Sequence, residues 1–72
     1  MPQLEMFSVV ALLEDRPEKG LARGQVGTIV EALAPGVYEV EFSDDNGETY
    51  ASLAVSSSSL LPLLHKPTYQ AA

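Results

Sequence analysis

Residues 25–43 read QVGTIVEALAPGVYEVEFS, and this stretch decides the fold. Its first part, residues 25–33, is β-branched in the middle and leads into a Pro-Gly pair, which is typical of a strand that ends in a tight turn. In its second part, apolar and acidic residues alternate. We therefore expect an antiparallel hairpin with one buried face and one solvated face that carries Glu39 and Glu41.

Gly27 stands inside the first strand of this hairpin. A glycine at such a position marks a sharp bend, a bulge or a close approach of other backbone. A bend of this kind lets one strand serve two sheets of a small barrel. We therefore expect the fold to depend on Gly27.

The flanking sequence predicts three further strands, at residues 7–13, 48–55 and 60–64. The first is rich in Val and Phe, and Pro17 stops it from continuing as a helix. The Asn46-Gly47 pair predicts the turn before the strand at 48–55, because both residues tolerate a positive φ.

The segments between these strands have their own signals. Residues 14–24 contain proline and glycine and predict a long first loop, in which Leu21 is the apolar side chain expected to anchor the loop to the core. The four serines at 56–59 predict a single helical turn. Pro62 fits an edge strand, because its missing N–H can face away from the ladder.

Five short strands within about 60 residues predict an all-β domain, closed into a small barrel that leaves no long sheet edge exposed. A helical fold is not expected, because no segment shows a sustained apolar period of 3.6 residues. We expect one domain over residues 1–72, with its core at about 7–64 and a flexible tail at 65–72.

The hairpin and its surroundings resemble known families. The resemblance to SH3-like barrels with a KOW-type hairpin is carried by Gly24, the run Gly27-Thr28-Ile29-Val30-Glu31, the Pro-Gly turn, Tyr38-x-Val40-x-Phe42 and Asp45-x-Gly47. This resemblance implies a small five-stranded SH3-like barrel with a long first loop. Basic loops bind RNA in the KOW class, whereas this chain carries acidic residues around the hairpin, so RNA binding is not carried over.

The chain also resembles a bacterial family of domains of unknown function and of about this length, over residues 7 to about 64. That resemblance is carried by Val9-Val10-Ala11-Leu12, Asp15-x-Pro17-x-x-Gly20-Leu21, the hairpin motifs, Gly47-x-Thr49 and Leu60-Leu61-x-Leu63. Some members are encoded beside toxin-like nuclease proteins. The resemblance therefore implies an antitoxin or immunity role.

The charge balance argues against nucleic acid as a partner. Ten acidic residues against four basic ones give a net charge of −6, and phosphate binding depends on Lys and Arg. Arg16, Lys19 and Arg23 do share the first loop, but acidic residues are interleaved with them. We expect no nucleic-acid partner.

Six acidic residues gather on or beside the hairpin, and they are the candidate partner-binding residues: Glu31, Glu39, Glu41, Asp44, Asp45 and Glu48. We expect Glu31 at the end of its strand and the others on the outer face or around the next turn, which would form one negative end. Like charges this close are mildly destabilising. They are either a solvated face that maintains solubility or a surface for a basic protein partner.

The chain offers little for chemistry. It has no cysteine, and its single histidine, His65, cannot supply a metal site or act as a base for the serines at 56–59. Residues 44–47 resemble part of a calcium loop, but Phe42 and Leu53 stand where further ligands are required. We predict no catalytic residue, no metal and no cofactor, and therefore no enzyme.

Three functions remain open on this basis. The first is a non-catalytic protein-binding module, an antitoxin or immunity protein that masks a basic toxin. The second is a structural accessory subunit of a larger complex, held by a sheet edge or by the tail, and the third is an RNA-associated barrel. No apolar run reaches the ~20 residues that span a membrane, and the first six residues lack the features of a signal peptide. We expect a cytoplasmic protein with no membrane contact, and the oligomeric state is left open.

Overall fold

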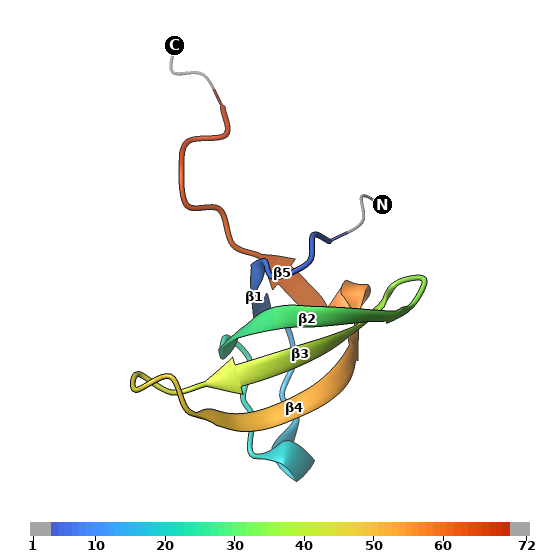
Figure 1. Cartoon of the computed structure of the whole chain (residues 1–72), viewed down its shortest axis with the longest axis vertical. Helices are drawn as coiled ribbons and strands as arrows, with labels where there is room; N and C mark the ends of the chain where they lie inside the picture. The colour runs from blue at the N-terminus through green and yellow to red at the C-terminus, as the bar shows by residue number, and fades with distance from the viewer. Residues whose placement is uncertain (1–3, 70–72) are drawn as a thin grey trace.

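The hairpin predicted at residues 25–43 is the centre of the structure. In the computed structural model, which describes residues 4–69, the hairpin comprises β2 (Val26–Ala34) and β3 (Val37–Ser43). β1 (Val9–Leu12) pairs with β2, β4 (Thr49–Ser56) pairs with β3, and β5 (Leu60–Pro62) pairs with β1. All pairings are antiparallel, and the strand order is β4-β3-β2-β1-β5 (Figure 1). The predicted all-β class with five strands is confirmed.

The sheet is curled rather than flat. Figure 1 shows β2, β3 and β4 side by side, while β1 and β5 run at a steep angle to β3 and β4. β4 and β5 stand at the two ends of the strand order, and no ladder joins them within residues 4–69. The closure of the sheet into an SH3-like barrel stays a prediction.

The core lies on the inner face of this curled sheet. The alternation in β3 buries Tyr38, Val40 and Phe42, as the sequence predicts. The other buried members of the cluster come from every remaining strand and from the first loop: Val10, Leu12, Leu21, Ile29, Leu53, Val55 and Leu60. The predicted anchor Leu21 is only 3% exposed, so the loop is fixed to the core by one side chain.

Gly27 sits where another residue would collide with β3. A Cβ placed there would lie 2.7 Å from Val40 Cγ1, 2.9 Å from the carbonyl oxygen of Glu41 and 2.9 Å from Phe42 Cδ1. The irregularities of β2 lie elsewhere, at residues 29–31 and 32–34. Of the three roles that the sequence allowed for Gly27, the close approach is the one observed.

The long first loop is ordered by local hydrogen bonds. Arg16 and Leu21 exchange backbone N–H···O bonds of 2.8 and 3.0 Å around the single turn η1 (Pro17–Lys19). Asp15 Oδ1 accepts the backbone N–H of Arg23 at 2.8 Å. The predicted helical turn in the serine run is also present, as η2 (Ser57–Ser59).

The first strand is shorter than the predicted 7–13. Phe7 has a φ of 64°, in the left-handed region that breaks an extended backbone, and β1 begins two residues later. Phe7 nevertheless remains beside β2, because its N–H donates to the carbonyl of Ile29 at 2.7 Å.

β5 forms one edge of the sheet. Pro62 lies opposite Val10. On either side of this pair, Leu63 N–H donates to the carbonyl of Val9 (3.0 Å) and Leu13 N–H donates to the carbonyl of Ser59 (2.9 Å). Since hydrogen-bonded and non-bonded pairs alternate in an antiparallel ladder, the N–H that proline lacks belongs on the solvent side. This is the edge position that the sequence predicts.

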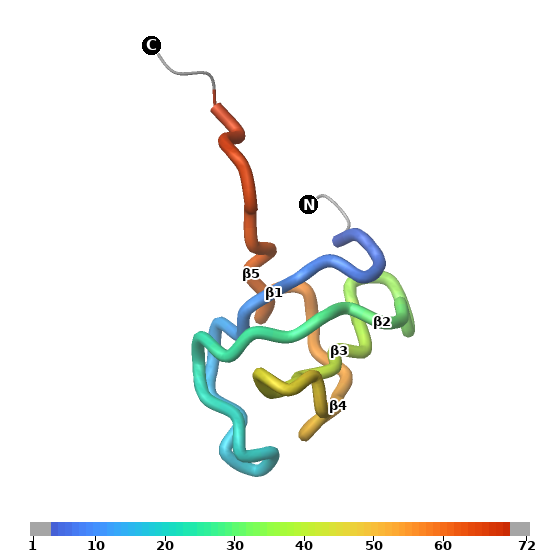
Figure 2. Tube along the Cα trace, turned by 60° about the vertical axis from the view of Figure 1, so that its left-hand side comes forward, coloured from blue at the N-terminus to red at the C-terminus, as the bar shows by residue number. Residues whose placement is uncertain are grey.

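The chain after β5 extends away from the sheet, as Figure 2 shows. Residues 64–69 are exposed, and the last part of the predicted tail, 70–72, lies outside the described residues. The only helical segments in the part of the chain that the structure describes are the two short turns, neither of which is a candidate membrane span.

Candidate protein-binding surface

The outer face of β3 carries Glu39 and Glu41, as the alternation predicts, and both side chains are half-buried. Glu41 stands between Thr28 on β2 and Ser52 on β4. The Ser52 hydroxyl donates to Glu39 Oε2 at 2.6 Å, which draws that carboxylate over β4.

A bulge brings Glu31 onto the same face. In β2, Ile29 is opposite Val40 on the inner side, and strict alternation would turn Glu31 inward as well. The register shifts by one residue between Ile29 and Glu31, so that Glu31 lies directly opposite Glu39. Two carboxylates therefore face each other across neighbouring strands. We call the surface formed by Glu31, Glu39 and Glu41 the acidic sheet face.

Within residues 4–69, no Lys or Arg forms a salt bridge with the acidic sheet face. The one salt bridge among residues 4–69 joins Arg16 Nε to Glu14 Oε2 at 3.8 Å, in the first loop. Directly opposed like charges destabilise a sheet, and here no neighbouring Lys or Arg offsets them.

The other three candidate acids belong to the turn between β3 and β4. Asp44 Oδ1 accepts the backbone N–H groups of Asn46 (2.9 Å) and Glu48 (3.0 Å), so its carboxylate closes the turn. Asp45 and Glu48 are exposed. The structure thus places three of the six acids on the outer face of β2 and β3 and the other three in the turn that follows β3.

The first loop has mixed charge. Glu14 contacts Arg16 and also accepts a hydrogen bond from the Ser59 hydroxyl. Ser59 is the buried polar residue of the described chain, and its partner lies 45 positions away in sequence. No local pattern could have revealed this contact. It ties the first loop to η2 and commits one acid of the loop to a structural role.

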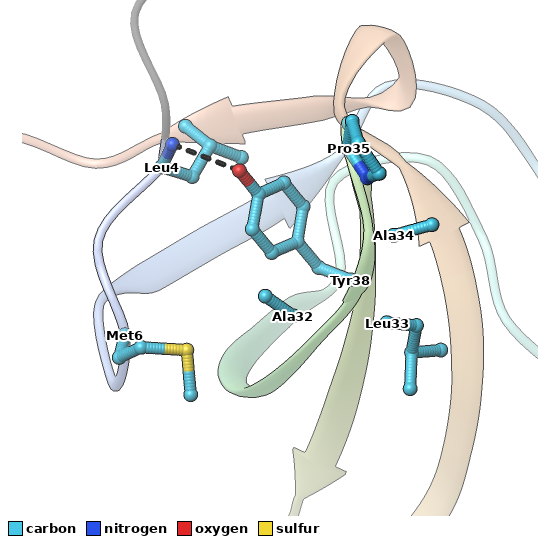
Figure 3. Close-up of a pocket in the computed structure, with 8 residues that line it drawn as sticks. Leu4, Met6, Ala32, Leu33, Ala34, Pro35 and Tyr38 are labelled. Atoms are coloured by element: carbon cyan, nitrogen blue, oxygen red, sulfur yellow. Dashed lines mark hydrogen bonds between the residues drawn. The ribbon is translucent and has the colours of Figure 1, made fainter.

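An apolar hollow of about 290 Å³ lies beside the β2–β3 turn, and the sequence did not predict it. Figure 3 shows the ring of Tyr38 at its centre, with Leu4 and Met6 on one side and Leu33 and Pro35 on the other. The backbone N–H of Leu4 donates to the Tyr38 hydroxyl at 3.2 Å. Among residues 4–69, the side chains that line the hollow are uncharged, and the Tyr38 hydroxyl is their one polar group.

Metal ligands are not clustered in the described residues. No group of three or more His, Cys, Asp or Glu side chains within 4–69 is placed to hold a metal ion. His65 is exposed in the segment that follows β5.

Fold and surface together define a small all-β domain whose outer sheet face is acidic. Residues 6–62 match the family model described as "Domain of unknown function (DUF4926)", and the chain belongs to this family. The predicted resemblance to a family of small domains of unknown function is thereby confirmed. Searches of the curated proteins and of the solved structures gave no match.

Proposed function

We propose that this domain is a non-catalytic module that binds a basic surface of a protein partner through its acidic sheet face. One observation carries the proposal: Glu31 is placed opposite Glu39, beside Glu41, with no compensating cation within residues 4–69. Lys or Arg side chains of a partner would supply the missing charge.

A domain of this size has little stability to spare. A like-charge pair on facing strands costs a few tenths to about 1 kcal/mol, and the core of a chain of this size rarely supplies more than about 3–5 kcal/mol of stability. A surface kept only for solubility could distribute its charges more widely. A surface that attracts a basic partner benefits from concentrating them, because complementary charge speeds association and selects partners.

An antitoxin or immunity protein that masks a basic toxin in the bacterial cytoplasm is the form of this function that we propose. The alternative, an accessory subunit held by a sheet edge, is favoured by a separate observation: within residues 4–69, one side of β4 pairs with no other strand. RNA binding through the first loop is disfavoured by the engagement of Arg16 with Glu14 and by the acidic excess of the chain.

The test is a comparison of immobilised wild-type domain with the double variant Glu39→Gln/Glu41→Gln in native extract, at low and high salt, with mass spectrometry of the retained proteins. Asp45→Asn serves as the matched control, because it removes a negative charge at the turn instead of on the sheet. We expect a basic protein that wild type and control retain at low salt and that the double variant loses. Equal retention by all three variants, or recovery of the bait alone, would contradict the proposal.

A further inference from the structure

The two edges of the sheet differ in how they are protected. β5 is three residues long and contains Pro62, whereas β4 is eight residues long and has neither a proline nor a charged residue in its sequence TYASLAVS. Proteins normally shield sheet edges with short strands, prolines or charges, because exposed N–H and C=O groups pair with other chains. β4 is therefore the unshielded edge of this domain.

The alternation of bonded and non-bonded pairs along β4 identifies the residues whose backbone groups do not bond to β3. The N–H of Ser57 donates to the carbonyl of Gly36 at 2.8 Å, next to the pair of Ser56 with Val37. Bonded and non-bonded pairs alternate in an antiparallel ladder. The inward-facing residues of β4 thus bond to β3, and Ser52 and Ala54 turn their N–H and C=O groups to the open side.

Ser52, Ala54 and Ser56 carry small side chains on the outer face of β4, beside the acids of β3, whereas the large Tyr50 stands near the start of the strand. The Ser52–Glu39 hydrogen bond already holds one carboxylate over β4. A residue of an added strand opposite Ser52 would lie two strand spacings, about 10 Å, from Glu41, a span that an extended Lys or Arg and a Glu side chain cover together.

We propose that β4 accepts an extended strand of a basic protein partner, with Lys or Arg at alternate positions facing Ser52 and Ala54. This inference rests on the proposed function and names the binding edge and the sequence pattern of the partner. Backbone pairing supplies the affinity in such strand additions, and the alternate side chains supply the specificity.

A second copy of this chain is the less suitable occupant. β4 has no basic residue to place opposite Ser52 or Ala54. Pairing of two β4 strands would leave Glu39 and Glu41 of both copies uncompensated in one continuous sheet, on chains that each carry a net charge of −6.

The probe is a synthetic peptide of alternating Lys and Val residues, with a matched peptide in which Glu replaces Lys. Both are titrated into ¹⁵N-labelled full-length chain, and amide shifts and hydrogen exchange are recorded. We expect the Lys peptide to give saturable shifts along β4 and about tenfold slower exchange at Ser52 and Ala54. The Glu peptide should give neither.

Four variants distinguish the contribution of the β4 edge from that of the acidic charge. Ala54→Pro removes an N–H that points to the open side and is not bonded to β3. Because this N–H would pair with the added strand, its loss should abolish binding. Because that variant could fail to fold, Ala54→Lys provides a second test: it charges the edge and should also abolish binding, whereas Ala22→Lys adds the same charge in the first loop and should weaken it only slightly. Glu39→Gln should weaken binding about two- to fivefold.

The possible outcomes distinguish this inference from the proposed function. If the peptide shifts the acidic sheet face but leaves the exchange of Ser52 and Ala54 unchanged, strand addition is refuted while the acidic face remains a binding surface. If the Lys peptide does not bind at all, both fail. Self-association through β4 in the absence of peptide, detected by light scattering, would also overturn the inference.

Discussion

Gly27→Ala places one methyl group against β3, and its effect can be worked out from the distances. The new Cβ would lie under 3.0 Å from two side-chain atoms and from the carbonyl oxygen of Glu41. Val40 and Phe42 are fully buried, and the carbonyl belongs to the central ladder, so none of the three neighbours can move cheaply. Overpacking costs about 1–3 kcal/mol, and we expect the upper half of that range. For a domain of this size, each kcal/mol lowers Tm by about 4–8 °C.

The loss of stability is measured by thermal and urea unfolding, monitored by circular dichroism. We expect Gly27→Ala to lower Tm by about 8–24 °C, and Gly27→Val, which adds two more carbons, to unfold the domain. Gly20→Ala is the control: its φ is +71° but no atom lies within 4 Å of the new Cβ. It should cost only about 1–2 kcal/mol, from backbone strain. A Gly27→Ala variant that melts within experimental error of wild type would refute the steric argument.

Three further variants test the anchor, the turn and the acidic sheet face. Leu21→Ala should destabilise the domain by about 2–5 kcal/mol in urea unfolding, because a buried side chain is removed from the core. Asp44→Ala should cost about 1–2 kcal/mol through the loss of two N–H···O bonds, while Asp45→Ala, at an exposed neighbour, should change stability little. Glu31→Gln should raise the free energy of unfolding by about 0.2–1 kcal/mol at low salt, because it removes the repulsion with Glu39, and the gain should shrink as salt is added. A destabilised Glu31→Gln variant would contradict the repulsion argument.

The parts of the fold that depend on local pattern were predictable. The period-two alternation of β3 identified its buried face, because a strand between two neighbours must bury one side. The turn at Asn46-Gly47 is present, although only Gly47 adopts a positive φ and Asn46 does not. The edge position of Pro62 follows from the N–H that proline lacks. Strand ends were less predictable: β1 begins after Phe7, whose left-handed φ no residue preference signals.

The surface was predictable in composition but not in arrangement. The outward placement of Glu39 and Glu41 follows from alternation, whereas the position of Glu31 depends on a bulge that only the pairing with β3 defines. The turn-closing role of Asp44 did have a local signal, because Asp commonly accepts N–H groups of the residues that follow it in a turn. The Glu14–Ser59 contact had none, since the two residues meet only in the folded chain.

The bulge at residues 29–31 makes the length of β2 as informative as its composition. Before it, Thr28 faces outward and Ile29 inward, whereas beyond it Glu31 faces outward and Ala32 lies opposite Tyr38, until the register shifts again between Ala32 and Ala34. Loss of the bulge without loss of a residue would direct Glu31 toward the core, opposite Tyr38, whereas deletion of Val30 would remove the bulge and keep Glu31 opposite Glu39. Two relatives could therefore share nearly every letter of this strand and still present different surfaces, so that both the spacing and the register between Ile29 and Glu31 must be compared before their binding properties are equated.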